Sequence, residues 1–277
     1  MEITTTIRVA LEGKICTTPS GHSRLIKFYN FCQQYSDCTI YIDFTQLYWF
    51  DANLSALLQA ILYKLNIESN LTFSFDIDLI KRKFPILLRN GFLASYLRLP
   101  DGAGSTVGIE TFLINEDEKF LDYIQNDLFG NHKMSGYNCL EIQDHFLELF
   151  ANIGRHARTT DPVFACGQYY PSQSKLYFTI LDLGIGFLPP IAEYTSGEIS
   201  TSIAAIEWAI KYNHSTKGKF ETGGLGLYNL LNHCQKNGGQ FNIITEDAFW
   251  GNNLGEMGTR IVPEFTGTVI HLNYNCK

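Results

Sequence analysis

The sequence has no long apolar run, no closely spaced cysteine pair and no Walker-type phosphate loop, and each absence excludes a class of protein. No apolar stretch approaches the roughly 18–20 residues that a membrane-spanning helix needs, so we expect no such helix. The seven cysteines form no C-x-x-C pair. This argues against a zinc site or a disulfide framework and favours reduced thiols in the cytoplasm. The string G-x-x-x-x-G-K-[ST] is also absent, which excludes a P-loop nucleotide site.

Positive charge is scarce as well. The chain carries 21 Lys and Arg against 28 Asp and Glu, a formal net charge of −7. Because an acidic surface repels phosphate backbones and anionic lipids, we expect neither nucleic acid nor membrane as a partner. The first residues contain no basic region followed by an apolar stretch, so no signal peptide is expected. Together these features predict a cytoplasmic protein, and 277 residues leave room for two domains.

The segment 148–157, ELFANIGRHA, predicts a helix with a polar stripe. Glu148, Asn152 and His156 recur every four residues, so they share one helix face. A carboxylate, an amide and an imidazole are costly to bury without partners. We therefore expect the stripe to line a cleft while the apolar residues of the same helix meet a core. A solvated amphipathic helix is the alternative.

A second motif follows a buried strand. The strand 176–181, LYFTIL, ends in Asp182, Gly184 and Gly186. Glycines at this place let a ligand approach the backbone, and a carboxylate can accept a hydrogen bond from an exocyclic amine such as that of adenine. An ordinary Asp-Gly turn is the alternative. A dinucleotide fingerprint is disfavoured because Pro189 stands where its third glycine is needed.

A third motif, TGGLGL at 222–227, runs into a helical pattern, YNLLNHCQKN. A glycine-rich loop that opens a helix presents free amide donors and the positive end of the helix dipole, which suits phosphate. The connection from Asp182 to this loop is about 35 residues long, longer than a plain loop. It contains a helical pattern, SIAAIEWAIKY, and a polar stretch with Lys217 and Lys219.

Taken in order with Gly267-Thr268, these motifs resemble the GHKL superfamily of gyrase B subunits, heat-shock chaperone ATPases, histidine kinases and mismatch-repair ATPases. The resemblance covers roughly residues 116–277 and four ordered motifs. It implies an α/β fold, a two-layer sandwich in which helices pack on one face of a mixed sheet. The candidate strands of that sheet are 163–169, 175–181, 240–245 and 268–274.

The same resemblance implies a Mg·ATP site. Asn152 would hold Mg²⁺ at the phosphates, and Glu148 would be the general base or orient the attacking water or hydroxyl. Asp182 would receive the adenine amine. The other residues that it assigns to the nucleotide are Arg155 and His156 (phosphate or sugar), Gly184 and Gly186 (the wall at adenine), Lys217 (terminal phosphate), Gly224, Leu225 and Gly226 (phosphate loop) and Thr268 (adenine, through a water). For Lys217 or Lys219, a solvated charged loop is an equal alternative.

The first hundred residues predict a separate small α/β domain, because strand-like and helical stretches alternate there. The expected boundaries are 1–100 for this domain, 101–115 for a linker and 116–277 for the ATP-binding domain. The stretch IDFTQLYWFDANLSALLQAIL resembles the STAS domains of anti-sigma-factor antagonists. Asp51 matches the aspartate of the phosphorylated turn, but Ala52 stands at the phosphoserine position and cannot form a phosphoester. Asn53 and Ser55 allow a one-residue shift in this alignment.

Two classes of function follow. The first is a regulatory serine/threonine protein kinase or slow ATPase of a signalling system. The second is a non-catalytic, nucleotide-gated interaction module. Glu148 favours the enzyme, since a sensor needs no base, whereas Ala52 favours the module or a substrate in trans. Both imply ATP, Mg²⁺ and a protein partner, with a homodimer as one open alternative. The short helix expected at 117–128 is too little for a histidine kinase bundle.

Overall fold

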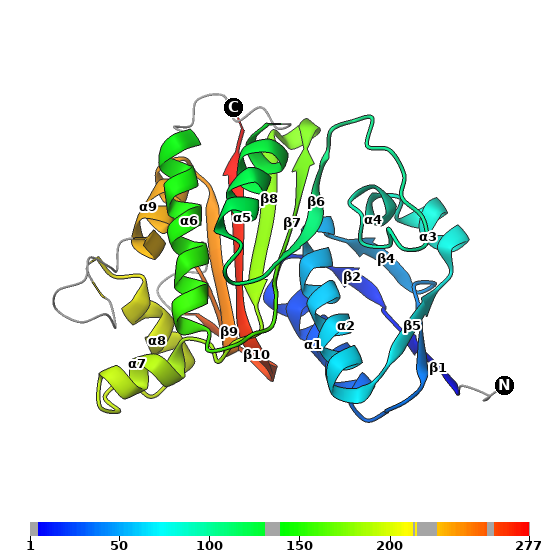
Figure 1. Ribbon diagram of the computed structural model, residues 1–277, viewed down its shortest axis with the longest axis horizontal. Helices are drawn as coiled ribbons and strands as arrows, with labels where there is room; N and C mark the ends of the chain where they lie inside the picture. The colour runs from blue at the N-terminus through cyan, green and yellow to red at the C-terminus, as the bar shows by residue number, and fades with distance from the viewer. Residues whose placement is uncertain (1–4, 131–138, 213, 215–225, 254–257, 277) are drawn as a thin grey trace.

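The computed structural model describes residues 5–130, 139–212, 214, 226–253 and 258–276 (Figure 1). The architecture is mixed α/β, with one five-stranded sheet, one three-stranded sheet and one pair of short strands in the described part. A smaller N-terminal unit packs against a larger unit that holds the five-stranded sheet. None of the described helices is both long and apolar enough to cross a membrane.

The N-terminal unit alternates strands and helices, as the sequence predicts. Its strands are β1 (Thr6–Ala10), β2 (Gly13–Ile15), β3 (Thr39–Asp43), β4 (Leu47–Phe50) and β5 (Thr72–Phe75). Its helices are α1 (Pro19–Cys32), the 3-10 turn η1 (Ala52–Leu54), α2 (Ser55–Ser69), α3 (Ile77–Lys83) and α4 (Ile86–Arg89). The order β1-β3-β5 is parallel throughout, and β2 pairs with β4 in parallel. The chain from 77 to 89 forms two helices, α3 and α4, because Pro85 cannot donate the backbone bond that would continue α3.

The larger sheet has the order β6-β7-β8-β10-β9. Its strands are β6 (Thr106–Phe112), β7 (Val163–Tyr170), β8 (Lys175–Asp182), β9 (Gln240–Gly251) and β10 (Thr259–Asn275). All four pairings are antiparallel, so the mixed sheet that we expected is wrong in this respect. The pairings are antiparallel partly because strands that follow one another in the chain lie side by side. β7 turns back into β8 through a short turn at Pro171–Gln173, and β9 likewise pairs with β10.

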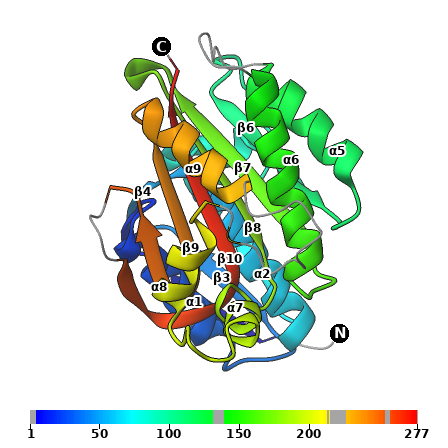
Figure 2. The ribbon, with the colours of Figure 1, turned by 90° about the vertical axis from the view of Figure 1, so that its left-hand side faces the viewer.

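Helices cover both faces of this sheet (Figure 2). One face carries α5 (Asp117–Tyr123), the π-helix η2 (Ile124–Phe129), α6 (Cys139–His156) and α9 (Gly226–Lys236). α7 (Leu188–Tyr194) and α8 (Ser202–Ala209) lie at the end of the sheet, where α8 contacts β9. The other face meets α1 and α2 of the N-terminal unit. Because side chains alternate along a strand, Ile270 of β10 faces α6 and α9 while its neighbour Val269 faces the N-terminal unit.

The expected division of the chain needs two corrections. The predicted linker 101–115 contains β6, which pairs with β7 and buries Val107 and Phe112 in the core below α5 and α6. The N-terminal unit is also not separate, since one hydrophobic cluster joins its helices to Leu181 and Val269 of the large sheet. The pairing of β6 and the packing of the N-terminal unit both depend on contacts between distant segments. The glycine- and serine-rich composition near residue 100 does not reveal such contacts.

A buried polar chain crosses the interface between the two units. Asn53 Nδ2 donates to Thr179 Oγ1 at 2.8 Å, and this hydroxyl bonds His271 Nδ1 at 2.7 Å. His271 Nε2 faces His22 Nε2 of α1 at 2.5 Å. Burial lowers the pKa of His22 to about 3, so that imidazole is neutral. These directional bonds fix how η1 and α1 sit on β8 and β10.

Candidate functional site

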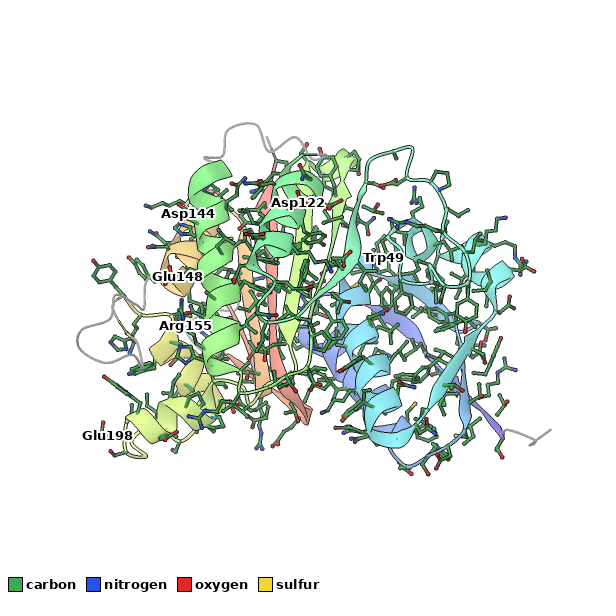
Figure 3. All side chains as sticks on the ribbon, in the orientation of Figure 1. Trp49, Asp122, Asp144, Glu148, Arg155 and Glu198 are labelled. Carbon is green, nitrogen blue, oxygen red and sulfur yellow. The ribbon has the colours of Figure 1, made fainter. Side chains whose placement is uncertain are left out.

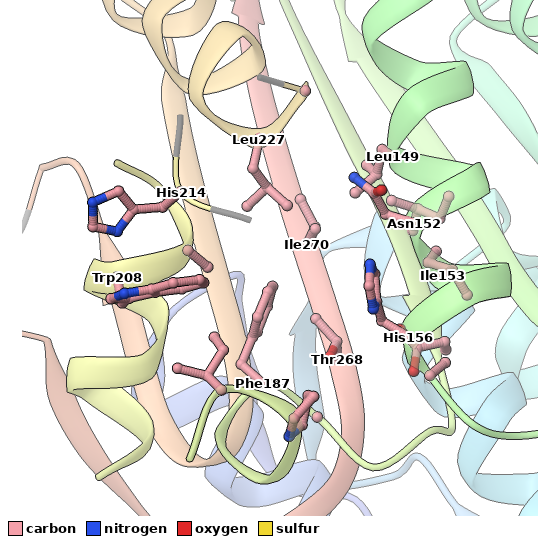
Figure 4. Close-up of a pocket in the computed structure, with 18 residues that line it drawn as sticks. Leu149, Asn152, Ile153, His156, Phe187, Trp208, His214, Leu227, Thr268 and Ile270 are labelled. Carbon is pink, nitrogen blue, oxygen red and sulfur yellow. The ribbon is translucent and has the colours of Figure 1, made fainter. Parts of the chain in front are cut away.

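A pocket of about 120 Å³ opens between α6, α7, α8, the start of α9 and the ends of β8 and β10 (Figure 4). Its walls are mainly apolar, with Leu149 and Ile153 from α6, Leu227 from α9 and Ile270 from the sheet. A dry cavity of about 150 Å³ holds benzene. The pocket is therefore of the size of an aromatic ring.

Two residues of the polar stripe point into this pocket. Asn152 and His156 project from α6 toward the far wall, which carries Trp208 and His214 (Figure 4). Asn152 and His156 are both half-buried. The shared face that the sequence predicts thus lines a pocket, and the alternative of a fully solvated helix is excluded for these two side chains.

Glu148 lies one turn before Asn152 and packs against the first residue of α9. A Cβ added to Gly226 would lie 2.6 Å from the Glu148 carboxyl carbon, closer than any real contact. A side chain at position 226 would therefore displace the Glu148 carboxylate from this place. Glu148 does not line the ring-sized pocket itself, but it stands beside the N-terminus of α9.

Arg155 is exposed and does not line the pocket. Its Nη1 donates to Asn152 Oδ1 at 3.0 Å. This is the oxygen that the resemblance assigns to Mg²⁺, so a cation there would compete with Arg155. Among the described residues, no three His, Cys, Asp or Glu side chains are grouped as metal ligands. Mg²⁺ commonly takes only one or two protein oxygens plus water and phosphate, and the hard oxygens of Asn152 and Glu148 fit that need.

Asp182 ends β8 at the edge of the pocket and is 4% exposed. Its Oδ1 accepts from the Gly184 backbone N–H at 2.8 Å, and the Thr268 backbone also bonds its carboxyl. Burial raises the pKa of Asp182 to about 7 despite these bonds. The backbone amides of Gly184, Thr268 and Asp182 itself stabilise the ionised carboxyl, and a ligand N–H would stabilise it further.

The glycines after β8 have different roles. Gly186 lines the pocket with φ +77, and a Cβ there would overlap Thr245 and Glu246. Gly184 instead packs against Ala157 at the end of α6 and is outside the pocket wall. Of the two glycines expected to shape a ligand wall, Gly186 therefore lines the pocket, while Gly184 acts through helix packing.

Several residues of the site were not predicted. Thr245 Oγ1 accepts from the Phe187 backbone N–H at 3.3 Å, and Glu246 Oε1 accepts from Leu188 at 3.1 Å. Both bonds hold the loop that leads from Gly186 into α7. On the opposite wall, the rings of Trp208 and His214 lie 4.9 Å apart. The apolar pattern around Trp208 predicted a helix but carried no signal of the distant face it would line.

The remaining predicted residues divide into two groups. Thr268 lines the pocket and pairs with Asp182 across the β8–β10 ladder. Gly226 begins α9 and also lines the pocket. Lys217, Gly224 and Leu225 lie outside the described residues, as does the alternative Lys219.

Neither a scan against models of known protein families nor a search of curated proteins finds a match to this chain. The functional argument therefore depends on the residues and geometry of the site itself.

Proposed function

We propose that this protein binds Mg·ATP in a GHKL-type site and acts as a regulatory serine/threonine protein kinase or slow ATPase. One observation carries the proposal: a buried carboxyl, Asp182, faces the same ring-sized apolar pocket as Asn152 and His156 of α6. Apolar walls with a few placed polar groups are typical of small-molecule sites. An adenine ring would lie between the apolar walls with its amine toward Asp182.

The phosphates would extend from this ring toward Glu148 and the start of α9. Asn152 Oδ1 would hold Mg²⁺, which when bound neutralises phosphate charge. Glu148 would accept the proton of the attacking water or hydroxyl. Its packing against Gly226 supports this role, because the carboxylate stands where the α9 amides begin.

The N-terminal unit favours action in trans over phosphorylation within the chain. Ala52 is fully buried and lacks a hydroxyl, and the nearby Ser55 is also fully buried, its Oγ accepting from Asn90 Nδ2 at 3.0 Å. Neither position offers an accessible acceptor. The same observation supports the second candidate function, a nucleotide-gated interaction module that regulates a protein partner without chemistry.

Asp182→Asn should weaken ATP binding by about 1.5–3 kcal/mol, the range for a hydrogen bond to a charged group. GTP should bind worse than ATP to the wild type, because its ring presents a carbonyl where adenine has the amine. Isothermal titration calorimetry with Mg²⁺ measures both effects. Asp144→Asn, an exposed carboxylate on α6, is the matched control and should bind like wild type. Equal affinities for ATP and GTP would remove the adenine assignment.

The raised pKa of Asp182 gives this prediction a pH dependence. The folded pKa of about 7 lies above the unfolded value near 3.9, so the free protein loses stability as pH rises from about 4 to 7. The adenine amine binds the ionised form best. ATP affinity should therefore rise up to roughly tenfold between pH 6 and 8. The pH profile of Asp182→Asn reports the titration of the ATP phosphates alone and serves as the baseline. If the wild-type affinity changes with pH in parallel with that of the variant, the assignment of Asp182 is contradicted.

Asn152→Ala should abolish the Mg²⁺ dependence of ATP binding and leave the fold intact, since the side chain is half-buried at a pocket and outside the core. Calorimetry with and without Mg²⁺ measures the first effect, and thermal unfolding the second. Gln143→Ala, earlier on the same helix, controls for loss of an amide. If Asn152→Ala unfolds the protein or keeps its Mg²⁺ dependence, the side chain is structural.

A further inference from the structure

A second cavity, about 460 Å³ in volume, lies at the junction of α4, the loop that follows it, β6 and the π-helix η2. The chain between α4 and β6 forms the arch at the upper right of Figure 1. The cavity shares no lining residue with the nucleotide pocket. Its charged lining consists of two arginines and two aspartates: Arg89, Arg98, Asp101 and Asp127.

Arg98 is exposed and has no charged partner among the described side chains. Its guanidinium lies against two glycines, since added Cβ atoms at Gly91 and Gly108 would be 3.8 Å from Cζ and 3.9 Å from Nη2. No side chain in the described part of the protein forms an ion pair within 4.0 Å of it. A guanidinium with five donors therefore lines the cavity without an ion-pair partner.

Asp127 is the opposite charge on the other side of the cavity. Burial, Asp122 and Glu110 raise the pKa of its carboxyl, while Arg98 lowers it. Arg98 and Asp127 therefore influence each other, yet no ion pair within 4.0 Å joins them in the described part of the chain. A cation placed beside Asp127 would relieve the repulsion from Asp122 and Glu110.

The second arginine is also incompletely paired. Asp101 Oδ2 accepts from the backbone N–H and the hydroxyl of Thr106, both at 2.7 Å. Arg89 Nη1 lies 3.8 Å from Asp101, beyond hydrogen-bond distance. Arg89 Nε is buried and has no acceptor among the described residues. Because Arg89 lines the cavity and its side chain is 28% exposed, its outer guanidinium nitrogens can also donate to a carboxylate.

The backbone around the cavity departs from regular structure on two sides. β6 shifts register between Val107 and Glu110, which places Gly108 at the irregularity. η2 forms a π-helix through Asp127. Bulges and π-turns are common beside functional sites, where they redirect side chains. Here Gly108 and Asp127, one from each irregular segment, both line the cavity.

We propose that this cavity binds a free α-amino acid. Its carboxylate would take the guanidinium groups of Arg98 and Arg89, and its ammonium group would take the carboxylate of Asp127. Guanidinium and carboxylate form strong paired hydrogen bonds. The two aspartates would repel a simple dianion, and the two arginines would repel a dication. A zwitterion, which carries both charges, therefore complements the lining best. The volume lies within the range of small-ligand sites.

Thermal unfolding of the full chain without nucleotide tests this site independently of ATP binding. The probes are the common α-amino acids, each at millimolar concentration, with succinate as a dianion and putrescine as a dication. At least one amino acid should raise the Tm by a few °C, about what saturating ligands give, while succinate and putrescine should not. Calorimetry with that amino acid should then give one site per chain.

Arg98→Met and Asp127→Asn should each remove the rise in Tm, and both positions are exposed enough to leave the fold intact. Arg82→Met and Asp78→Asn, exposed residues of α3, are the matched controls and should keep it. The proposal is overturned if no amino acid raises the Tm, or if the rise survives in either cavity variant. It is equally overturned if succinate acts as well as the amino acid and Asp127→Asn changes nothing, because the cavity would then be a plain anion site.

Discussion

Glu148→Gln should retain ATP binding and lose turnover. Glutamine keeps the size and hydrogen bonding of the side chain but cannot accept a proton, and a positioned general base contributes about 10²–10⁴-fold to rate. Single-turnover assays with labelled ATP, alone and with cell extract, measure hydrolysis and phosphotransfer together. Wild type should be slow alone and faster with its partner, and Glu148→Gln inactive in both conditions.

The structure offers a matched control for this variant. Asp144 is an exposed carboxylate one turn before Glu148 on α6, and Figure 3 shows both on that helix. Asp144→Asn removes the same charge from the same helix and should keep full turnover. Equal rates for Glu148→Gln and wild type would remove Glu148 from the mechanism. If wild type shows no turnover even with extract, the nucleotide-gated module becomes the better description.

Features encoded by local periodicity could be predicted. The spacing of Asn152 and His156 is a property of one helix, and the structure places both in one pocket. Asp182 could be placed at a strand end because the apolar run before it is continuous, and the strand does end there. The motifs also led us to place Thr268 in the same site as Asp182. That the two residues are direct neighbours across β8 and β10 is seen only in the structure.

Features that depend on distant segments could not be predicted. β6 pairs with β7 about fifty residues later, and the glycine-rich stretch before it hid a strand whose own residues, TVGIETF, favour a strand. Asn53 and His271 form part of one buried polar chain although more than two hundred residues separate them. Thr245 and Glu246 shape the pocket by holding the backbone of a loop, a role that leaves no pattern in the sequence.

Gly267→Ala should lower the free energy of unfolding by about 3–5 kcal/mol, combining backbone strain with overpacking. Gly267 has φ +122, a conformation that alanine rarely adopts, and its Cβ would overlap the backbone oxygen of Asp182. The added methyl would push β10 away from β8 at the pair that carries Thr268 and Asp182.

Urea denaturation measures this loss, and calorimetry should show weakened ATP binding in whatever folded protein remains. Gly102→Ala is the control, because that glycine is exposed and nothing lies within 4 Å of an added Cβ. It should change stability by less than about 0.5 kcal/mol. If Gly267→Ala is equally mild, the close approach of the two strands is not what holds Asp182 at the pocket. The carboxyl would then have to be positioned by Gly184 and the end of α6 alone.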